Sequence, residues 1–384
     1  MSTKTEALHA SVFAFEAAYF TCCKAIKLLC CWQSLRQAVT VIGMLKRNKN
    51  TPDWQQHARD HATEYLHRFV HNPGVERIVK EFDPRYLAIQ DTNQRIDFLA
   101  KLAAEQWDFR KGRERYEITE EFEIDAPDSA LGKIVFEGSS YAEMASSSKA
   151  SLKHYSILAI LGGANMSPYY RLRYGLEQDI TYDMLAYMGS EREVLAPEAA
   201  ITKDYAAGAQ TEFDLGRGAI NTLMADTLSD EGMYDVATSE WHIARLQTKE
   251  GTPIFMLSAP PFLGQKRANT ADTYDFLRRL EQEAFNPTKN ILFVTAAIFR
   301  YAQYFDAVRE ISLRTGVDVE VIGFNQEYTG NLFKPSQLLQ ELKAAADAAV
   351  RLRDAVNGRE ERNEWRKRYY NRFERDESMR PEKR

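Results

Sequence analysis

Four short apolar runs in the second half of the chain constrain its fold more than any other feature. The runs lie at 156–161, 253–258, 290–295 and 317–322. Helical patterns surround them, at about 169–189, 211–227, 270–284 and 300–315. Apolar strands that alternate with helices indicate parallel pairing, with helices covering the sheet. The sequence therefore predicts a three-layer, Rossmann-like α/β domain with a mostly parallel sheet.

This α/β domain is expected over 151–330, between two regions of different character. Residues 1–115 predict an α-helical region, with helical patterns at 54–70, 75–82 and 94–109. Residues 116–150 predict a linker with short strands, because apolar residues partly alternate between 116 and 124. Residues 331–384 predict a helix, at 338–356, followed by a charged tail.

Charge and hydropathy limit the partners that we expect. The 384 residues include 50 Lys and Arg against 55 Asp and Glu, a net charge of −5, so there is no electrostatic reason to expect a nucleic acid. Charged residues interrupt the apolar segment before residue 45, and no stretch reaches the roughly 18 uncharged residues of a spanning helix. Without the form of a secretory signal either, the chain is expected to be cytoplasmic. Its oligomeric state stays open.

Two segments near the ends of the chain allow more than one interpretation. Cys22, Cys23, Cys30 and Cys31 match neither zinc nor disulfide spacing, so buried packing is favoured over lipidation or a metal. Beyond residue 358, aromatic residues interleave with Arg and Lys. Docking of this stripe on the protein itself is favoured over binding to RNA or an anionic membrane.

The first candidate site follows the run 156–161. In open α/β sheets, ligands bind in the crevice beyond the carboxyl ends of the strands. Gly162, Gly163 and Asn165 stand there, and paired glycines let the backbone approach a ligand and offer N–H groups to an anion. Arg171, on the next helix, is expected to face the same crevice. A tight turn without a ligand is the alternative.

Further candidates follow the other runs. Asn269 and Thr270 stand where a helix begins, so one of them is either an N-cap or a ligand contact. Arg267, just before them, would supply charge to a phosphate or carboxylate. Thr295 closes the run 290–295. These residues extend the predicted ligand-binding set.

Glu212 is the candidate general base. It opens the helical pattern at 211–227, where a carboxylate also suits the positive helix N-terminus, so capping explains it as well as catalysis does. The sequence contains no GxSxG elbow, Walker loop or HExxH motif. His57, His61, His67 and His71 form two HxxxH pairs that point in different directions on a straight helix. We therefore expect no metal site.

The order of these motifs over about 157–325 resembles the ElyC/SanA/YdcF family. The segments that carry the resemblance are 160–163, 171–173, Thr211-Glu212, 267–273, 291–296 and 316–321. The resemblance implies a Rossmann-like fold with a crevice lined by these motifs. It also implies links to envelope metabolism and, in one branch, to binding of S-adenosylmethionine.

The chain departs from that pattern after Thr295. Phe299 and Arg300 stand where the family usually has a His and then an Arg, so Arg300 would keep an anion-stabilising role without proton transfer. Two hypotheses follow. The first is a small-molecule-binding protein, in its enzymic form acting on or with a nucleotide-like or phosphorylated ligand, with S-adenosylmethionine or another nucleotide as the candidate cofactor. The alternative is a non-catalytic interaction or sensor protein.

Overall fold

The computed structural model describes residues 53–113, 118, 120–229, 234–237, 241–261, 268–280, 289–330 and 332–358. The chain divides into two units, Met1–Pro52 and Asp53–Arg384, and every described residue belongs to the second. The four cysteines, the aromatic and basic stripe beyond residue 358, and Arg267 lie outside the described residues. What the sequence predicts for them stays a prediction.

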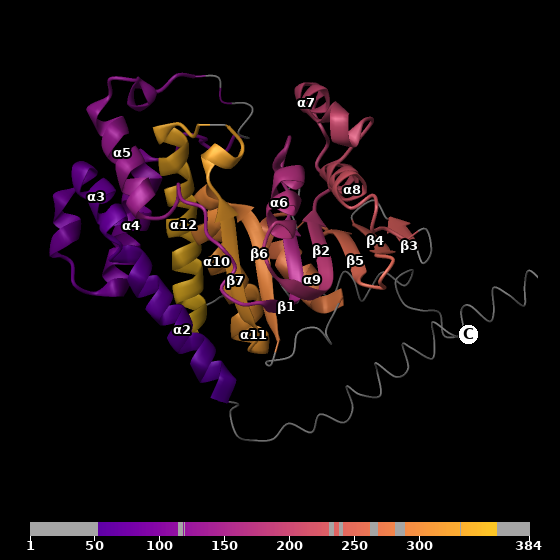
Figure 1. Cartoon of the computed structure of the whole chain (residues 1–384). Coiled ribbons are helices and arrows are strands. Elements are labelled where there is room, and N and C mark those ends of the chain that lie inside the picture. The colour runs from indigo at the N-terminus through magenta and orange to yellow at the C-terminus, as the bar shows by residue number, and fades with distance from the viewer. Residues whose placement is uncertain are drawn as a thin grey trace, which may run out of the picture. The chain divides into compact units, whose positions relative to one another are not determined.

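The described residues form a seven-stranded sheet in the order β3-β4-β5-β2-β1-β6-β7 (Figure 1). Its strands are β1 (His154–Leu161), β2 (Thr181–Gly189), β3 (Tyr234–Ala237), β4 (His242–Gln247), β5 (Pro253–Ser258), β6 (Asn290–Ala296) and β7 (Asp318–Phe324). From β5 to β7 in this order all neighbours are parallel, whereas β3 and β4 add an antiparallel edge. The predicted mostly parallel sheet is confirmed.

Helices cover both faces of this sheet and complete the predicted three layers. One layer contains α6 (Ser167–Leu176), α7 (Ala196–Ala206) and α8 (Glu212–Leu223). The other contains α9 (Thr270–Leu280), α10 (Arg300–Ala307), a π-helical turn (Val308–Ser312) and α11 (Leu313–Thr315).

Alternation of side chains along the strands assigns each helix to its face. A Cβ on Gly175 of α6 would lie 3.0 Å from Ile160 Cδ1 and 3.3 Å from Val294 Cγ2, so α6 packs closely on that face. Tyr274 of α9 contacts Phe293, which directly precedes Val294 in β6, with ring centroids 4.7 Å apart. Hence α6 and α9 lie on opposite faces of the same strands, and both faces of the central strands are buried.

A helical region precedes the sheet, and a long C-terminal helix joins the two. The helices are α2 (Asp53–Val70), α3 (Pro73–Phe82), α4 (Thr92–Gln106), α5 (Ala130–Tyr141) and α12 (Pro335–Val356). Helix α12 contacts α2, α4 and α5 on one side and α10 on the other, and Figure 1 shows it standing between them. The N-terminal helices therefore share a core with the α/β layers.

Two segments differ from the sequence-based expectation. Residues 130–141 form α5 where a linker with short strands is expected, because Val135 and Gly138 pack its inner face against α3. Residues 169–189 hold most of α6 and then all of β2, not one helix. Met184 to Met188 read as helix formers by propensity, but β1 and β5 bury them as a central strand.

Among the helices of the described residues, none is sufficiently long and apolar to cross a membrane.

Candidate functional site

The sheet has a switch point between β1 and β6. From β1 the chain crosses through α6 to β2 on one side, whereas from β5 it returns through α9 to β6 on the other side of β1. Doubly wound sheets bind ligands outside the carboxyl ends of strands at such a point. We call this region the carboxyl edge and define it by Gly162, Ser190, Ser258 and Thr295, at or near the ends of β1, β2, β5 and β6.

The backbone of Gly162 and Gly163 is tightly enclosed at this edge. Gly162 N donates a hydrogen bond to Met188 O at 2.7 Å, which extends the pairing of β1 with β2. A Cβ on Gly162 would lie 2.6 Å from that same oxygen and would overlap the Glu212 carboxylate. A Cβ on Gly163 would lie 2.9 Å from Ser167 Cβ. Only glycine fits this turn without displacement of its neighbours.

Arg171 holds the glycine turn through hydrogen bonds to its carbonyl groups. Its side chain is buried, and Nη1 donates to Leu161 O at 3.0 Å and also to Gly162 O. Its guanidinium carbon lies 5.5 Å from the ring centre of Phe299, which follows β6. Arg171 therefore connects the two strands of the switch point by holding the backbone.

Asn165 completes the turn in the left-handed conformation, with φ of +53°, which Asn tolerates better than most residues. Its carbonyl accepts a hydrogen bond from Tyr205 Oη at 2.7 Å. Burial raises the pKa of the Tyr205 hydroxyl, so this donor keeps its proton. The Asn165 side chain is exposed, so its amide group is accessible at the carboxyl edge.

Glu212 lies on the β2 side of the edge. Capping of α8 belongs to Thr211 and Asp214, whose side chains each bond the other's backbone N–H. Glu212 Oε2 instead accepts from Ser190 Oγ at 2.8 Å and lies 3.6 Å from Arg192 Nε. Its carboxylate is therefore part of the edge and not the cap of its helix.

Arg192 links Glu212 to a second carboxylate. Two of its nitrogens bond Glu198 at 2.8 and 3.0 Å. Burial alone would raise the pKa of Glu198, but the bonds from Arg192 and from the backbone N–H groups of Leu195 and Asn165 lower it overall. Glu198 therefore stays ionised and helps to hold the Asn165 turn.

Two hydroxyls at the edge are fully buried without a partner. Thr295 Oγ1 and Ser258 Oγ have no hydrogen-bond partner among the described residues. Such a group costs about 1–3 kcal/mol of desolvation, so each one calls for an explanation. Thr295 lies in the penultimate position of β6 on the α9 face, and Ser258 ends β5 opposite Gly189.

The remaining predicted residues are distributed along α9 and α10. Asn269 is the N-cap of α9, since its Oδ1 accepts from Asp272 N at 3.1 Å and its N donates to Asp272 Oδ2 at 2.9 Å. Thr270 is the first residue of the helix. Arg300 is buried and pairs with Glu143, after α5. The structure thus brings Gly162, Gly163, Asn165, Arg171 and Glu212 together, with Thr295 on the neighbouring strand, and gives Arg300 another partner.

Ser190, Arg192 and Glu198 were missed by the sequence analysis. They follow β2, which reads as part of a helix, so their position after a strand end is hidden. The available signal is the continuous apolar run 184–188 closed by Gly189, which is also typical of a buried strand.

Two other places bring polar or titratable groups together. His57 and His61 stack with ring centroids 6.4 Å apart, but no group of three or more potential metal ligands occurs in the described part of the chain. A cavity of about 110 Å³ lies between Phe109, Phe122 and the start of α12. Its acidic groups are already paired, Asp125 with Ser336, Glu341 with Arg110 and Glu120 with Arg113.

Comparison with known proteins finds a family model that matches a segment before the sheet. The profile of the Rv3785 N-terminal domain matches residues 54–132, which comprise α2 to the start of α5. Uncharacterized protein Rv3785 of Mycobacterium tuberculosis is 28% identical over 185 residues, which cover 44% of this chain and 51% of that protein. Uncharacterized protein Mb3814 of Mycobacterium bovis gives the same values. The chain spans about half the length of the curated relatives it matches. No solved structure gives a significant match.

These matches overturn the resemblance to the ElyC/SanA/YdcF family, which was wrong. The similarity is to Rv3785 proteins. The motifs that suggested the other family were a Gly pair after a strand, an Asn-Thr helix start and a Thr at a strand end. A doubly wound sheet places such residues at its carboxyl edge whatever its ancestry, so their order reflects the fold.

Proposed function

We propose that this chain binds a small molecule, nucleotide-like or phosphorylated, at the carboxyl edge beside the β1–β6 switch point. The observation that carries the proposal is the buried Thr295 hydroxyl, which has no partner among the described residues and lies near the end of β6, the strand beside β1, on the α9 face of the sheet. A protein retains a buried, unsatisfied polar group at a cost to stability, and a ligand that bonds it accounts for that cost.

The start of α6 supports an anionic group in the ligand. Helix α6 follows the glycine turn directly, and its N-cap residue, Met166, provides no side-chain hydrogen bond to the first turn. Pro168 has no backbone N–H, and those of Ser167 and Tyr170 bond Ala164 O and Met166 O. The Tyr169 N–H is therefore the group of this first turn that can meet a phosphate or carboxylate, which a helix N-terminus favours.

The contacts of the two predicted catalytic residues favour binding over a chemical step. Glu212 is held by Ser190 and Arg192, whereas Arg300 is paired with Glu143. An enzymic form would use Glu212 as a general base, but Arg300 belongs to another ion pair. This arrangement favours the sensor alternative for the same ligand site.

The test begins with native mass spectrometry of the purified protein, followed by thermal shifts with nucleotides, sugar phosphates and S-adenosylmethionine. A ligand at 100 times its Kd stabilises the folded state by about 2.7 kcal/mol. We expect Gly163→Ala to abolish this stabilisation, because a Cβ there disturbs the turn.

Gly175→Ala is the matched control. It adds a Cβ to the same strand–helix unit, 3.0 Å from Ile160 and away from the edge, so it lowers stability and keeps the ligand shift. No co-purified ligand and no shift across the panel would refute the proposal, as would equal loss of binding in both variants.

A further inference from the structure

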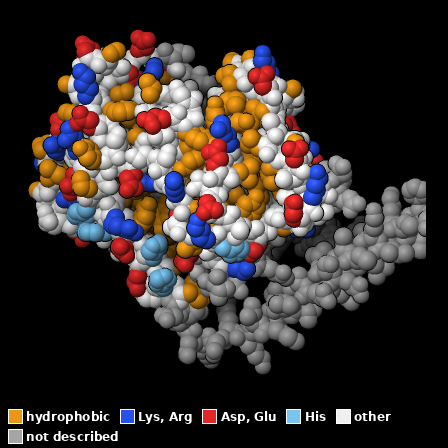
Figure 2. All heavy atoms as spheres, viewed as in Figure 1, with side chains coloured by type: hydrophobic (Ala, Val, Ile, Leu, Met, Phe, Trp, Pro, Cys, Tyr) orange, Lys and Arg blue, Asp and Glu red, His pale blue; other side chains and the backbone are white. Residues whose placement is uncertain are grey.

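Six aromatic rings form a continuous group around α6. They are Tyr169, Tyr170, Tyr174, Tyr205, Phe324 and Tyr328, joined by ring-centroid distances of 5.2 to 6.4 Å. Figure 2 shows hydrophobic side chains gathered on both flanks of this helix, with charged groups between them. Arg173 and Glu177 of α6 form an exposed ion pair.

The hydroxyl groups divide this aromatic set into two kinds. Those of Tyr174, Tyr205 and Tyr328 donate to Ser148 O, Asn165 O and Glu177 Oε2, at 2.7 to 2.9 Å. Among the described residues, the hydroxyls of Tyr169 and Tyr170 have no such partner. Both of these rings are half-buried, so each offers an exposed part of its surface together with a polar tip.

The position of Tyr169 and Tyr170 directs them to the carboxyl edge. They are the third and fourth residues of α6, and helix side chains tilt toward the N-terminus. Here the N-terminus of the helix adjoins the glycine turn. The two tyrosines occupy different flanks, because adjacent positions on a helix are about 100° apart.

The Tyr169 flank has the features of a ligand site. Tyr169 packs on Tyr205 at 5.3 Å, and Tyr205 fixes the carbonyl of Asn165. Glu198 bonds the Asn165 backbone N–H, so the turn is held from two sides while its amide side chain is exposed. Tyr170 instead contacts Phe324 and Tyr328 on the β7 flank, away from Asn165.

We propose that Tyr169 stacks on a planar, unsaturated ring of the ligand, of the nucleobase type, and that Asn165 lies where its amide meets the polar edge of that ring. This inference rests on the proposed function and specifies its ligand class. Aromatic side chains stack on any base through their π faces, and a Tyr hydroxyl and an Asn amide supply donors and acceptors at the rim.

The experiment compares ligands that differ only in the ring. Isothermal titration of the full chain uses AMP, GMP, CMP and UMP, with ribose 5-phosphate as the same sugar phosphate without a base. We expect Tyr169→Leu to weaken nucleotide binding about 5- to 150-fold, the equivalent of one lost stacking contact. The same substitution leaves the binding of ribose 5-phosphate, which is weaker than that of the nucleotides, unchanged.

Two further variants separate stacking from folding. Tyr169→Trp keeps a stacking face and retains nucleotide binding, so the proposal stays falsifiable even where Tyr169→Leu does not fold. Tyr170→Leu changes the same residue type on the same helix, toward the other flank, and leaves nucleotide binding unchanged.

The outcomes distinguish a failure of the ring site at Tyr169 from a failure of the proposed nucleotide-like ligand. Ribose 5-phosphate binding as tightly as the nucleotides, or loss of binding in Tyr170→Leu but not in Tyr169→Leu, overturns the ring site while a phosphorylated ligand at the edge stands. Loss in Tyr169→Trp equal to that in Tyr169→Leu also overturns it. Absence of binding by all five compounds overturns the nucleotide-like ligand and the ring site together.

Discussion

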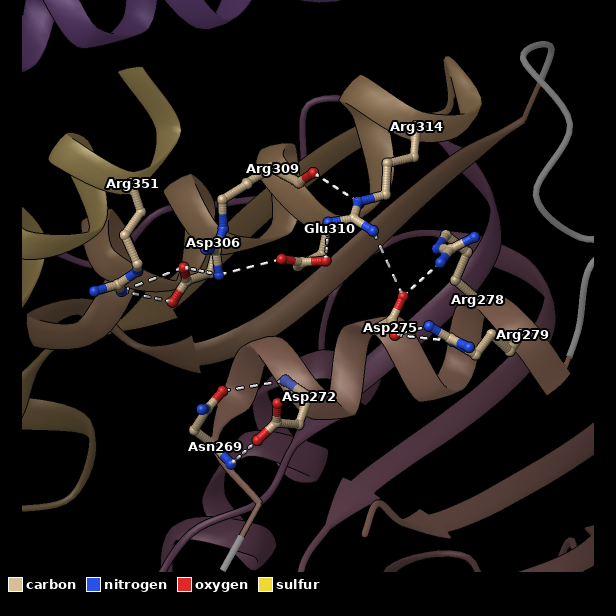
Figure 3. A network of polar contacts seen from close by, with 10 residues as sticks. All are labelled: Asn269, Asp272, Asp275, Arg278, Arg279, Asp306, Arg309, Glu310, Arg314 and Arg351. Carbon is tan, nitrogen blue, oxygen red and sulfur yellow. Dashed lines mark hydrogen bonds and ion pairs between the residues drawn. The ribbon is translucent and has the colours of Figure 1, made fainter. Parts of the chain in front are cut away.

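Two polar regions on the α/β layers differ in how their buried groups are satisfied. One is the carboxyl edge, where the Thr295 and Ser258 hydroxyls have no partner among the described residues. The other lies on α9, α10, the π-helical turn, α11 and α12, and is drawn in Figure 3. We call it the arginine cluster and define it by Arg278, Arg279, Arg309, Arg314 and Arg351 with Asp275, Asp306 and Glu310.

Every carboxylate of the arginine cluster has at least two guanidinium partners. Asp275 contacts Arg278, Arg279 and Arg314. Asp306 pairs with Arg309 at 3.1 Å and Arg351 at 3.2 Å. Glu310, almost fully buried, lies 3.2 Å from Arg309 and 2.7 Å from Arg314.

The difference between these two regions indicates different roles for them, one in the stability of the fold and one in ligand binding. A buried carboxylate is tolerated only with partners and hydrogen bonds, and the arginine cluster supplies several to each one, although Arg278 Nε itself has no hydrogen-bond partner among the described residues. The carboxyl edge leaves two neutral hydroxyls unsatisfied beside a turn that admits no side chain. We infer that the cluster serves the fold and that the edge serves a ligand.

The largest expected effect is in the arginine cluster. Glu310→Gln removes the charge that neutralises two guanidiniums, and we expect the unfolding free energy to fall by about 3 kcal/mol, measured by urea titration. The exposed pair of Glu64 and Arg68 gives the control, because Glu64→Gln costs less than about 0.5 kcal/mol. Equal, small effects would show that the cluster does not stabilise the fold.

An added methyl group at the edge comes next. Gly162→Ala places a Cβ against the Glu212 carboxylate and the Met188 carbonyl, and overpacking of this kind costs about 1–3 kcal/mol. We expect ligand binding to be lost as well, whereas Glu310→Gln retains it in the folded fraction. Normal stability and binding in Gly162→Ala would contradict the close packing of the edge.

The smallest effect is a dependence of stability on pH. The pKa of Glu198 is lower in the folded chain than its ordinary value of 4.5, so the folded state holds this proton less tightly than the unfolded state. Its contribution to stability is present above pH 4.5 and is lost as pH falls through the lower folded-state pKa. Urea titrations from pH 6 to pH 3 measure this loss.

Glu198→Gln is the control for that pH dependence. The variant is less stable than the wild type at pH 6 and approaches it at pH 3. The reason is that the variant lacks the ionised partner of Arg192 at every pH, whereas the wild type loses it only when Glu198 is protonated. An unchanged difference between the two proteins across this range would assign the acid sensitivity to other groups.

The fold was predictable to the extent that apolar runs were bounded by polar or turn residues. The run 253–258 lies between Thr252 and Ala259-Pro260 and coincides with β5. In contrast, β2 contains residues with high helix propensity, and only its burial between two strands decides its structure. Asn269 illustrates a local signal, since its cap with Asp272 spans three residues, but the sequence left an N-cap and a ligand contact open for it.

The partners of the candidate residues were not predictable, because they are distant in sequence. Arg300 is a residue type that binds anions, but its side chain bonds Glu143, which lies 157 positions away in the sequence. Arg171 is likewise engaged by carbonyls of the turn itself. The sequence thus placed several candidate residues at one edge of the sheet, and the structure determines which of their side chains are already engaged there.

Thr295→Val tests the central claim most directly, because it replaces the unpartnered hydroxyl with a methyl group of the same shape. We predict that the ligand-free protein gains about 1 kcal/mol of unfolding free energy and that AMP stabilises it less than it stabilises the wild type. Thr248→Val, at the opposite edge, removes a hydroxyl that accepts from Thr252 N and should lower stability without changing the response to AMP. A Thr295→Val protein that is destabilised, with an undiminished response to AMP, would contradict the account.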